Sequence, residues 1–492
     1  MKFPIVAFLI LLCFSTTFSQ LKPVVDDKGN FGLDVVNDRI RQHKYLEREN
    51  QLLVIGHQNL QLLDLTNFKV IETRSIVLPP YRDLRPGYGD DDWIISPDGR
   101  RMMLLGLIDA RTKTRTEDKQ AAWVLDLETS KRIALLERPD RIRAAKWSKN
   151  GKTLMTMDAA GVGPFTKTLN VSFWDGETFA YRHTITVENV TWIYLSNDGE
   201  RFFAASGKPK NLLGIKYVAD SDSVVHIWKT RSGELEKTIA AADPKFHFKT
   251  REIQITPDEE FLLMVKKHKS VSSEHRLLTW EINGGIKPKY ELRPQPKIDD
   301  SRVVFSPNGT YFALDVGKNL QIYETRTGKL KVELTNVELP SWGWLDNQVL
   351  ANVDYKSKNF FEMGKMLKAF DANDGRLLFK QRLDYAEGKE YSCCGSDDEG
   401  TTVVTDDTTL LPHPTRKIFA TSSNQFVKIF DSRTGELLQT VVHPLIRVDL
   451  MGKIKMTHGH TVLSADWSKD GKALYVFSAN RQSVSLWKLI ED

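Results

Sequence analysis

The chain has 492 residues, of which 69 are Lys or Arg and 64 are Asp or Glu, so its formal net charge is only +5. This mild charge argues against a nucleic-acid-binding protein, in which basic residues usually cluster in a stripe. Three cysteines cannot build a disulfide framework, and one ordinary hydrophobic core does not fill so long a chain, so several domains or a repeat are expected.

The first residues have the layout of a cleaved secretory signal. Lys2 precedes an apolar run from about Pro4 to Phe14, and Thr17-Phe18-Ser19 place small residues at −3 and −1 of a cut before Gln20. The apolar run is roughly 11 residues, against about 20 for a membrane-spanning helix. We therefore predict a signal peptide at 1–19 and a secreted or periplasmic mature protein that is not inserted in a membrane.

Two local signals recur through the rest of the chain. The first is a tight turn of the form Ser-x-Asp/Asn-Gly, which begins at Ser96, Ser148, Ser196, Ser306 and Ser468, with a degraded copy at Thr256. The second is an alternating strand that ends in an apolar residue followed by a polar, usually acidic one. It occurs at Leu63-Asp64, Leu125-Asp126, Trp174-Asp175, Trp228-Lys229, Trp280-Glu281, Tyr323-Glu324, Phe370-Asp371, Phe430-Asp431 and Trp487-Lys488.

Together these signals predict units of four short strands, a to d, in an all-β fold. Because helical patterns are essentially absent, we predict a single closed β-propeller over residues 47–492, with eight or nine four-stranded blades. An array of β-sandwiches is the alternative, but it does not explain why one pattern recurs from residue 51 to the end.

The two ends of the predicted ring must meet. The last unit stops at Asp492 without room for its strand d, whereas 51–56, 59–65 and 69–76 have the pattern of strands b, c and d. An unpaired sheet edge favours aggregation. We therefore expect part of residues 22–46, within an N-terminal segment 20–46, to supply the missing outer strand.

Residues 459–489 resemble a WD repeat. In that family a His, a Ser, a Trp and an Asp form a hydrogen-bonded set, but here Arg481 stands at the Asp position. The pattern is equally similar to the looser YVTN- and quinoprotein-like propeller repeats. The repeat positions that the resemblance implies are Trp174, Asp175, Asp222, Trp228, Trp280, His460, Ser478 and Trp487.

The long insertions all belong to one face of the predicted ring. Antiparallel strands place the a–b and c–d turns on one face and the b–c and d–a loops on the other. The long b–c insertions are 108–120, 158–168, 207–222, 267–274 and 354–365, and the long d–a insertions are 77–91, 383–407 and 442–459. Loops on a rigid scaffold often carry function. We therefore predict a monomer that binds a protein or other macromolecule there, with drift in loop length as the alternative.

Several of these loops carry distinctive chemistry. Loop 383–400 is acidic, the neighbouring loop 442–459 is mildly basic, and loop 354–365 holds two adjacent phenylalanines. The candidate interaction residues are Arg111, Lys113, Arg115, Phe360, Phe361, Asp397, Asp398 and Arg447. The alternative is that the charged loops are merely solvated and a phenylalanine packs back into its blade.

Cys393-Cys394 is the most unusual dipeptide, because adjacent cysteines can form a strained disulfide ring. Residues 367–381 resemble the repeat of the secreted quinoprotein alcohol dehydrogenases, with Phe379 at the usual Trp position. In those propellers such a ring stacks on pyrroloquinoline quinone. The sequence shows no convincing ligand set for that cofactor, so two incidental cysteines remain the other interpretation.

Other chemistry is weakly indicated. Acidic clusters at 90–92, 397–399 and 406–407 could suit calcium but lack the spacing of a calcium loop, so no metal and no cofactor are predicted. The sequence leaves open a propeller enzyme with a site at the central channel, of quinoprotein, lactonase-like or metal-dependent hydrolase type. Asn170, Asn189 and Asn308 open N-x-Ser/Thr sequons, which matter only if the source glycosylates.

Overall fold

The protein is described here from a computed structural model that covers strands, turns and short loops along the chain. The described residues are 21–23, 33–34, 42–46, 51–55, 59–64, 69–75, 93–105, 122–129, 131–137, 142–158, 168–212, 215–240, 246–268, 275–293, 303–316, 319–335, 337, 341–357, 363–382, 409–423, 426–442, 449–450, 453–454, 462–468, 471–478 and 483–489.

The described residues form strands and turns and contain no helix. Eight sheets are four-stranded and antiparallel, and each is built from four consecutive strands. The first four are β3 (Gln42–Leu46), β4 (Gln51–Ile55), β5 (Asn59–Asp64), β6 (Lys69–Ser75); β7 (Trp93–Ile95), β8 (Arg101–Leu104), β9 (Ala122–Asp126), β10 (Lys131–Leu136); β11 (Ala144–Trp147), β12 (Thr153–Met157), β13 (Thr168–Asp175), β14 (Tyr181–Glu188); and β15 (Val190–Leu195), β16 (Arg201–Leu212), β17 (Ile215–Lys229), β18 (Leu235–Ala240).

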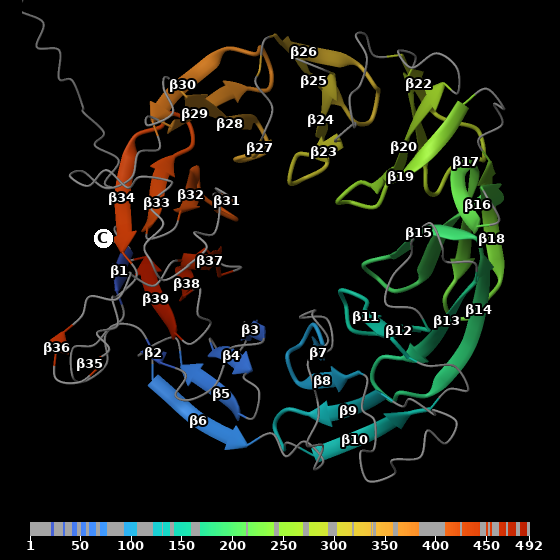
Figure 1. Cartoon of the computed structure of the whole chain (residues 1–492), viewed down its shortest axis with the longest axis horizontal. Coiled ribbons are helices and arrows are strands. Elements are labelled where there is room, and N and C mark those ends of the chain that lie inside the picture. The colour runs from blue at the N-terminus through green and yellow to red at the C-terminus, as the bar shows by residue number, and fades with distance from the viewer. Residues whose placement is uncertain are drawn as a thin grey trace, which may run out of the picture.

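The next four sheets continue in chain order. They are β19 (Phe246–Ile255), β20 (Phe261–His268), β21 (His275–Glu281), β22 (Tyr290–Leu292); β23 (Val303–Phe305), β24 (Tyr311–Val316), β25 (Asn319–Glu324), β26 (Leu330–Leu334); β27 (Ser341–Trp344), β28 (Val349–Ser357), β29 (Met363–Asp371), β30 (Leu377–Arg382); and β31 (Thr409–Pro412), β32 (Ile418–Ser423), β33 (Phe426–Asp431), β34 (Leu437–Val442). Figure 1 shows these blades following one another round a ring, from blue to orange-red.

A five-stranded sheet joins the two ends of the chain. It contains β37 (Val462–Trp467), β38 (Ala473–Ser478) and β39 (Ser483–Leu489), and both β1 (Leu21–Pro23) and β2 (Leu33–Asp34) pair antiparallel with β39. The register sets Leu21 opposite Leu489 and Leu33 opposite Val484. The prediction of an all-β propeller of four-stranded blades is confirmed.

The first blade begins earlier in the sequence than we predicted. β3 pairs with β4 from Gln42, opposite Ile55, to Leu46, opposite Gln51. The inner strand of this blade therefore comes from the segment 20–46, which we had set apart for closure, and not from residues after 47. The alternation of 42–46 is short and polar, so it did not stand out as a strand.

The repeated tight turns connect strands a and b, as predicted. At Ser96 the hydroxyl group donates to Asp98 Oδ1 at 2.5 Å and accepts the N–H of Arg101 at 2.9 Å. The fourth residue, Gly99, has φ of 71°, a left-handed conformation that glycine adopts without a steric penalty. The motif therefore satisfies its own polar groups within six residues, which is why it is recognisable from sequence.

The second repeated signal also has a local cause. Eight of the nine apolar–polar pairs end the third strand of their sheet, and the ninth, Trp487-Lys488, lies one residue before the end of β39. At Asp175 the carboxylate Oδ1 accepts the backbone N–H groups of Glu177 at 3.0 Å and Thr178 at 2.9 Å. These bonds lower the pKa of Asp175 to about 2. The acidic residue therefore caps the c–d turn.

The core lies between neighbouring blades and within them. Phe173 and Phe202, from adjacent blades, are both fully buried and meet edge to face with ring centroids 5.4 Å apart. Nearer the rim, Phe379 of β30 lies under the turn of the next blade, where a Cβ added to Gly435 would be 2.2 Å from its ring. Each blade thus buries its apolar side chains against its neighbours, as a repeat architecture requires.

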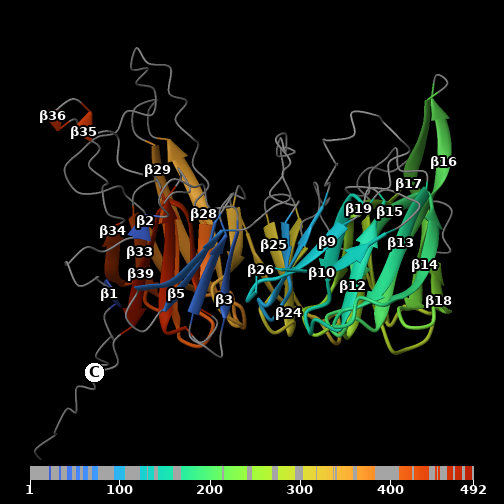
Figure 2. The same ribbon diagram turned by 90° about the horizontal axis from the view of Figure 1, so that it is seen from below.

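Figure 2 shows that the two faces of the ring differ. The a–b and c–d turns form the lower face in that view, and the strands run upward from them. β16 and β17 rise well above the other strands on the opposite side, as does the small sheet of β35 (Asp449–Leu450) and β36 (Lys453–Ile454). Two of the predicted insertions, 207–222 and 442–459, therefore have described strands on the side away from the turns.

Candidate functional site

The turn face is held together by hydrogen bonds that run from blade to blade. Asn150 donates its backbone N–H to Asn197 O at 3.1 Å, and Asn197 donates its own to Glu259 Oε1 at 2.7 Å. Farther round, the N–H of Asn308 donates to Asn347 Oδ1 at 2.9 Å. These polar groups are thus already used within the protein, which leaves fewer of them for a partner.

One of these contacts is built on an unusual residue. Glu259 stands where five of the other a–b turns carry glycine, and its φ is 58°. A left-handed conformation costs a residue with a side chain about 1–2 kcal/mol. Glu259 Oε1 also accepts the Tyr194 hydroxyl at 2.7 Å, so the carboxylate joins its turn to the neighbouring blade.

Lys146 and Trp192 extend this cluster along the inner strands. Lys146 Nζ lies 5.3 Å from the centroid of the Tyr194 ring, and Trp192 stacks beside Tyr194 with centroids 6.1 Å apart. Burial raises the pKa of Tyr194, and the bond to Glu259 raises it further. Desolvation lowers the pKa of Lys146, although Glu259 acts against this. The cluster joins three blades, and its geometry is that of a structural contact.

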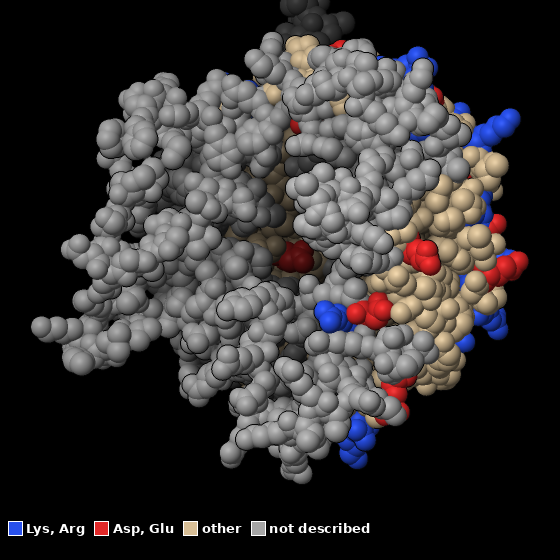
Figure 3. All heavy atoms as spheres, turned by 45° about the vertical axis from the view of Figure 1, so that its right-hand side comes forward, with Lys and Arg blue, Asp and Glu red and all other residues tan. Residues whose placement is uncertain are grey.

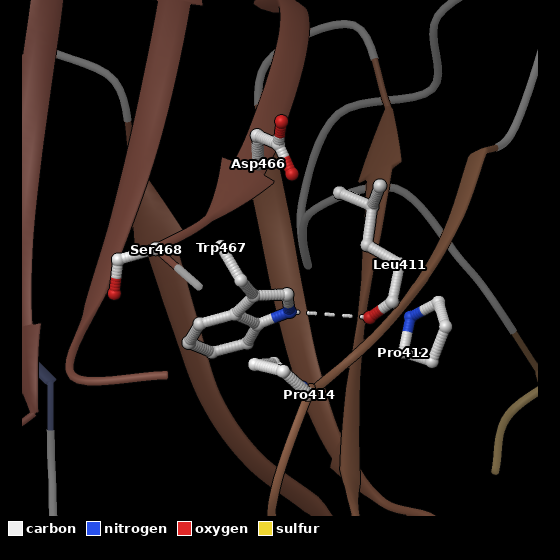
Figure 4. Close-up of a pocket in the computed structure, with 6 residues that line it drawn as sticks. All are labelled: Leu411, Pro412, Pro414, Asp466, Trp467 and Ser468. Atoms are coloured by element: carbon white, nitrogen blue, oxygen red, sulfur yellow. Dashed lines mark hydrogen bonds between the residues drawn. The ribbon is translucent and has the colours of Figure 1, made fainter. Parts of the chain in front are cut away.

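A recess of about 210 Å³ lies between β31 and β37 (Figure 4). It is lined by Leu411, Pro412, Pro414, Asp466, Trp467 and Ser468. Trp467 Nε1 donates to Leu411 O at 3.2 Å and so joins the two inner strands. Solvent reaches the Asp466 carboxyl group, yet the surrounding walls desolvate it and raise its pKa. The result is a small apolar recess with one carboxyl group at its edge.

His413 is a structural residue that the sequence analysis missed. It takes the place of the serine that opens five of the other a–b turns: its Nδ1 accepts the N–H groups of Thr415 at 3.1 Å and Arg416 at 2.9 Å. With Nδ1 as acceptor, Nε2 carries the proton and donates to Gly471 O in the next blade at 2.8 Å. The spacing to Pro414 and the following strand was the available signal, because Ser306-Pro307 shows the same arrangement.

No family model and no curated protein matches the chain. Among solved structures, the C-terminal WD40 domain of Sif2 is similar with TM-score 0.41 and 11% identity, over 82% of this chain and 97% of that one. Hydrazine synthase of Kuenenia stuttgartiensis gives 0.36 and 14%, over 84% and 100%. A eukaryotic initiation factor gives 0.38 and 13%, over 75% and 90%.

At these scores the likenesses carry no argument about activity or partner. The ring of four-stranded sheets decides the fold, because the predicted turn and strand-c signals lie in their expected places within it. The protein is a β-propeller. Its described surface in Figure 3 shows acidic and basic side chains interspersed, with no single sign dominating that view.

All eight predicted interaction residues fall outside the described part of the propeller. These are Arg111, Lys113, Arg115, Phe360, Phe361, Asp397, Asp398 and Arg447, together with Cys393, Cys394 and His460. Asp222 lies in β17 and Ser478 in β38. Whether the loop residues meet on one face, and whether the cysteines are joined, stays a prediction.

The tryptophans at the repeat positions belong to the core of the propeller. Trp174 donates from Nε1 to Thr156 Oγ1 at 2.9 Å, and Trp280 donates to Ile286 O at 3.1 Å. Trp487 is likewise buried, with 7% of its surface exposed, and Trp228 is partly buried against Phe202. These residues therefore stabilise blades and do not form a binding surface.

Two of the sequon asparagines have structural partners. Asn170 Nδ2 donates to Asp158 Oδ2 at 2.8 Å, and Asn308 Oδ1 accepts the N–H of Thr310 at 3.0 Å within its turn. Asn189 is the third, in a left-handed conformation with φ of 50°. A glycan on Asn170 Nδ2 would displace its bond to Asp158, so this sequon is poorly suited to modification.

The described residues contain no group of three or more His, Cys, Asp or Glu side chains placed to hold a metal ion. Among the same residues there is no helix that is long and apolar enough to cross a membrane.

The insertion at 207–222 is the best described part of the elaborated face. After a register shift between Ser206 and Lys208, β16 and β17 pair antiparallel from Lys208, opposite Ala219, to Leu212, opposite Ile215. The insertion thus lengthens its blade by a two-stranded ribbon. The backbone of this ribbon rises above the ring, in a position where a partner could reach it (Figure 2).

Proposed function

We propose that the protein is a secreted or periplasmic β-propeller that binds a protein or another macromolecule through the face formed by its b–c and d–a loops. The observation that carries this proposal is the contrast between the two faces. On the turn face, backbone and side-chain groups such as Asn197 N–H and Glu259 Oε1 bond to each other across blades. On the opposite face, the β16–β17 ribbon and β35–β36 stand off the ring (Figure 2).

The charges of two insertions favour a charged partner. Loop 383–400 carries Asp397 and Asp398, whereas loop 442–459 carries Arg447. Exposed charges act mainly on the encounter between partners, and they are screened beyond about 8 Å at physiological ionic strength. Binding that uses these loops should therefore associate faster at low salt.

The experiment compares two double charge reversals. The partner is recovered by pull-down from the secreted fraction of the source, and its association with the immobilised propeller is measured at low and physiological salt. Asp397→Lys with Asp398→Lys should change the association rate several-fold at low salt. The matched control, Glu128→Lys with Glu177→Lys, makes the same charge change at exposed positions of the c–d turns. A rate that responds only to the control pair would show that the wrong face was chosen.

The alternative function is a propeller enzyme with its site at the central channel. The observation that favours it is the raised pKa of Asp466 beside the recess on the inner strands, since perturbed carboxyl groups are common at active sites. Loss of a hydrolytic or dehydrogenase activity in Asp466→Asn, with unchanged partner binding, would support the enzyme in place of the scaffold.

A further inference from the structure

The upper part of the β16–β17 ribbon has two open edges among the described strands. The inner neighbour, β15, reaches only to Val190, opposite Ser206 on β16. The outer neighbour, β18, ends at Ala240, opposite Val224 on β17. Beyond both points the register of β16 and β17 shifts and skips residues 220–223 of β17, and pairing resumes from Lys208, opposite Ala219, to Leu212, opposite Ile215. No described strand pairs with residues 208–212 or 215–219 from outside the ribbon.

The edge of β16 is protected against a further strand. It carries Lys208-Pro209-Lys210, and both lysine and proline on an edge discourage pairing with another chain. In a hairpin with two residues between its strands the closing pair is hydrogen-bonded, and bonded and non-bonded pairs then alternate. Counting from Leu212 and Ile215, Pro209 falls in a non-bonded pair opposite Val218. The donor that proline lacks is thus the one that would face outward.

The edge of β17 is less protected, because it carries one lysine and no proline. Its upper part reads Ile-Lys-Tyr-Val-Ala at 215–219, a run rich in residues that favour strands and free of proline. By the same alternation, Lys216 and Val218 direct their backbone N–H and C=O groups away from β16. An extended peptide can pair with such groups and add itself to the sheet.

The composition of the ribbon and of the neighbouring strand favours a partner of negative charge. The insertion 207–222 contains Lys208, Lys210 and Lys216 together with Asp220 and Asp222. Contacts also place β17 against β19 of the next blade, whose first seven residues include Lys249 and Arg251 with a single acidic residue, Glu252. These segments together carry five basic and three acidic residues, so their net charge is positive.

We propose that the outer edge of β17 at residues 215–219 binds an extended acidic segment of a partner protein as an additional strand. The proposal rests on the proposed function, since the ribbon is one of the insertions of the loop face. An open strand edge offers alternating N–H and C=O groups, which match a peptide main chain and not a sugar–phosphate backbone. An acidic polypeptide is thus the occupant that uses both features of the ribbon, its edge and its charge.

The test uses the full mature chain and a fluorescein-labelled decapeptide of alternating Glu and Val. A decapeptide of alternating Glu and Pro carries the same charge but cannot pair as a strand, so it should bind at least tenfold more weakly by fluorescence anisotropy. A decapeptide of alternating Lys and Val should not bind. Equal binding of the two acidic peptides would overturn the strand-addition model, because charge alone would then explain it.

Variants of the ribbon sharpen the test. Val218→Pro removes an outward N–H while leaving the hydrogen bonds between β16 and β17 intact, so it should weaken binding of the Glu/Val peptide at least tenfold. The control Val218→Ala should bind the peptide as tightly as the wild type does. If circular dichroism shows that Val218→Pro has lost strand structure, Lys216→Glu is used in its place, and this variant should also weaken binding of the peptide at least tenfold. Unchanged affinity in a folded Val218→Pro variant, or in Lys216→Glu, would overturn the proposal.

The outcomes also separate this inference from the proposed function. If Val218→Pro leaves capture of the natural partner intact while the Asp397/Asp398 reversal impairs it, the scaffold function stands and the ribbon is not its site. If a single-stranded oligonucleotide competes with the peptide and Val218→Pro does not affect that competition, the ribbon acts as a polyanion contact and the peptide proposal is wrong.

Discussion

Replacing Gly471 with alanine separates backbone strain from contact between blades. Gly471 and Gly151 hold the same position in the a–b turns of two blades, with φ of 73° and 76°. A Cβ at Gly471 would lie 2.2 Å from Cε1 of His413 in the preceding blade. A Cβ at Gly151 would meet no atom closer than Pro97 Cδ at 3.9 Å. The two alanine variants therefore share the strain, and only one forces a neighbour to move.

The magnitude follows from what His413 would lose. The left-handed backbone costs alanine about 1–2 kcal/mol at either site. At Gly471 the imidazole ring must also shift, and overpacking of this kind costs roughly 1–3 kcal/mol. Its bonds to Thr415, Arg416 and Gly471 O would be weakened, at about 1 kcal/mol each when lost. We expect Gly471→Ala to destabilise the protein by about 2–4 kcal/mol more than Gly151→Ala.

Amide hydrogen exchange at Thr415 and Arg416 is the direct readout, because a ring of blades can unfold in parts. Both amides should exchange faster in Gly471→Ala and at the wild-type rate in Gly151→Ala. Urea unfolding gives the global comparison. Adding His413→Ser, the residue of the other turns, should recover much of the loss in Gly471→Ala. Equal destabilisation by the two alanines, with unchanged exchange at both amides, would refute the reasoning.

Three further outcomes are expected. Deleting residues 20–46 removes β1 from β39 and β3 from β4, so it should cause aggregation or a large fall in melting temperature; a monomer with unchanged melting would contradict ring closure by this segment. Burial raises the pKa of Tyr323 to about 12, so its contribution is present below pH ~10 and lost as pH rises towards 12; the melting temperature of Tyr323→Phe should fall less over that range. The pKa of Asp175 is lowered to about 2, so its contribution is present above pH ~4 and lost as pH falls to 2; the melting temperature of Asp175→Asn should therefore fall less than that of the wild type over that range, and an equal fall would contradict this.

The fold could be predicted because its signals are local. The bonds of the Ser96 turn span at most five residues, and the cap of Asp175 spans three. Interactions over so few residues require particular residue types at fixed spacings, so the same short motif can be recognised wherever it recurs in the sequence. The repetition then implied the ring, since units that cannot bury their own faces must stack on one another.

The parts that were missed depend on contacts far apart in the chain or on a changed residue type. His413 makes the turn contacts that serine makes elsewhere, and it also hydrogen-bonds to Gly471, 58 residues away. Neither its residue type nor the residues next to it in the sequence therefore predicted this structural role. From sequence, 207–222 is predicted only as an insertion, because Lys208-Pro209-Lys210 breaks the alternation of a strand. The pairing of 208–212 with 215–219 is shown by the register of β16 and β17 and does not follow from the composition of either segment.

The one-sided distribution of the insertions has a physical cause that also limits what it means. Lengthening an a–b turn would separate Asn150 from Asn197, or Asn197 from Glu259, at about 1 kcal/mol for each bond lost. By comparison, each doubling of the length of a flexible loop costs only about 0.6 kcal/mol of closure entropy. Insertions therefore accumulate on the side that tolerates them, whether or not they bind anything. What makes the β16–β17 ribbon more than a tolerated insertion is the difference between its two edges: the edge of β16 carries Pro209, which cannot donate a hydrogen bond, whereas the edge of β17 at 215–219 contains no proline.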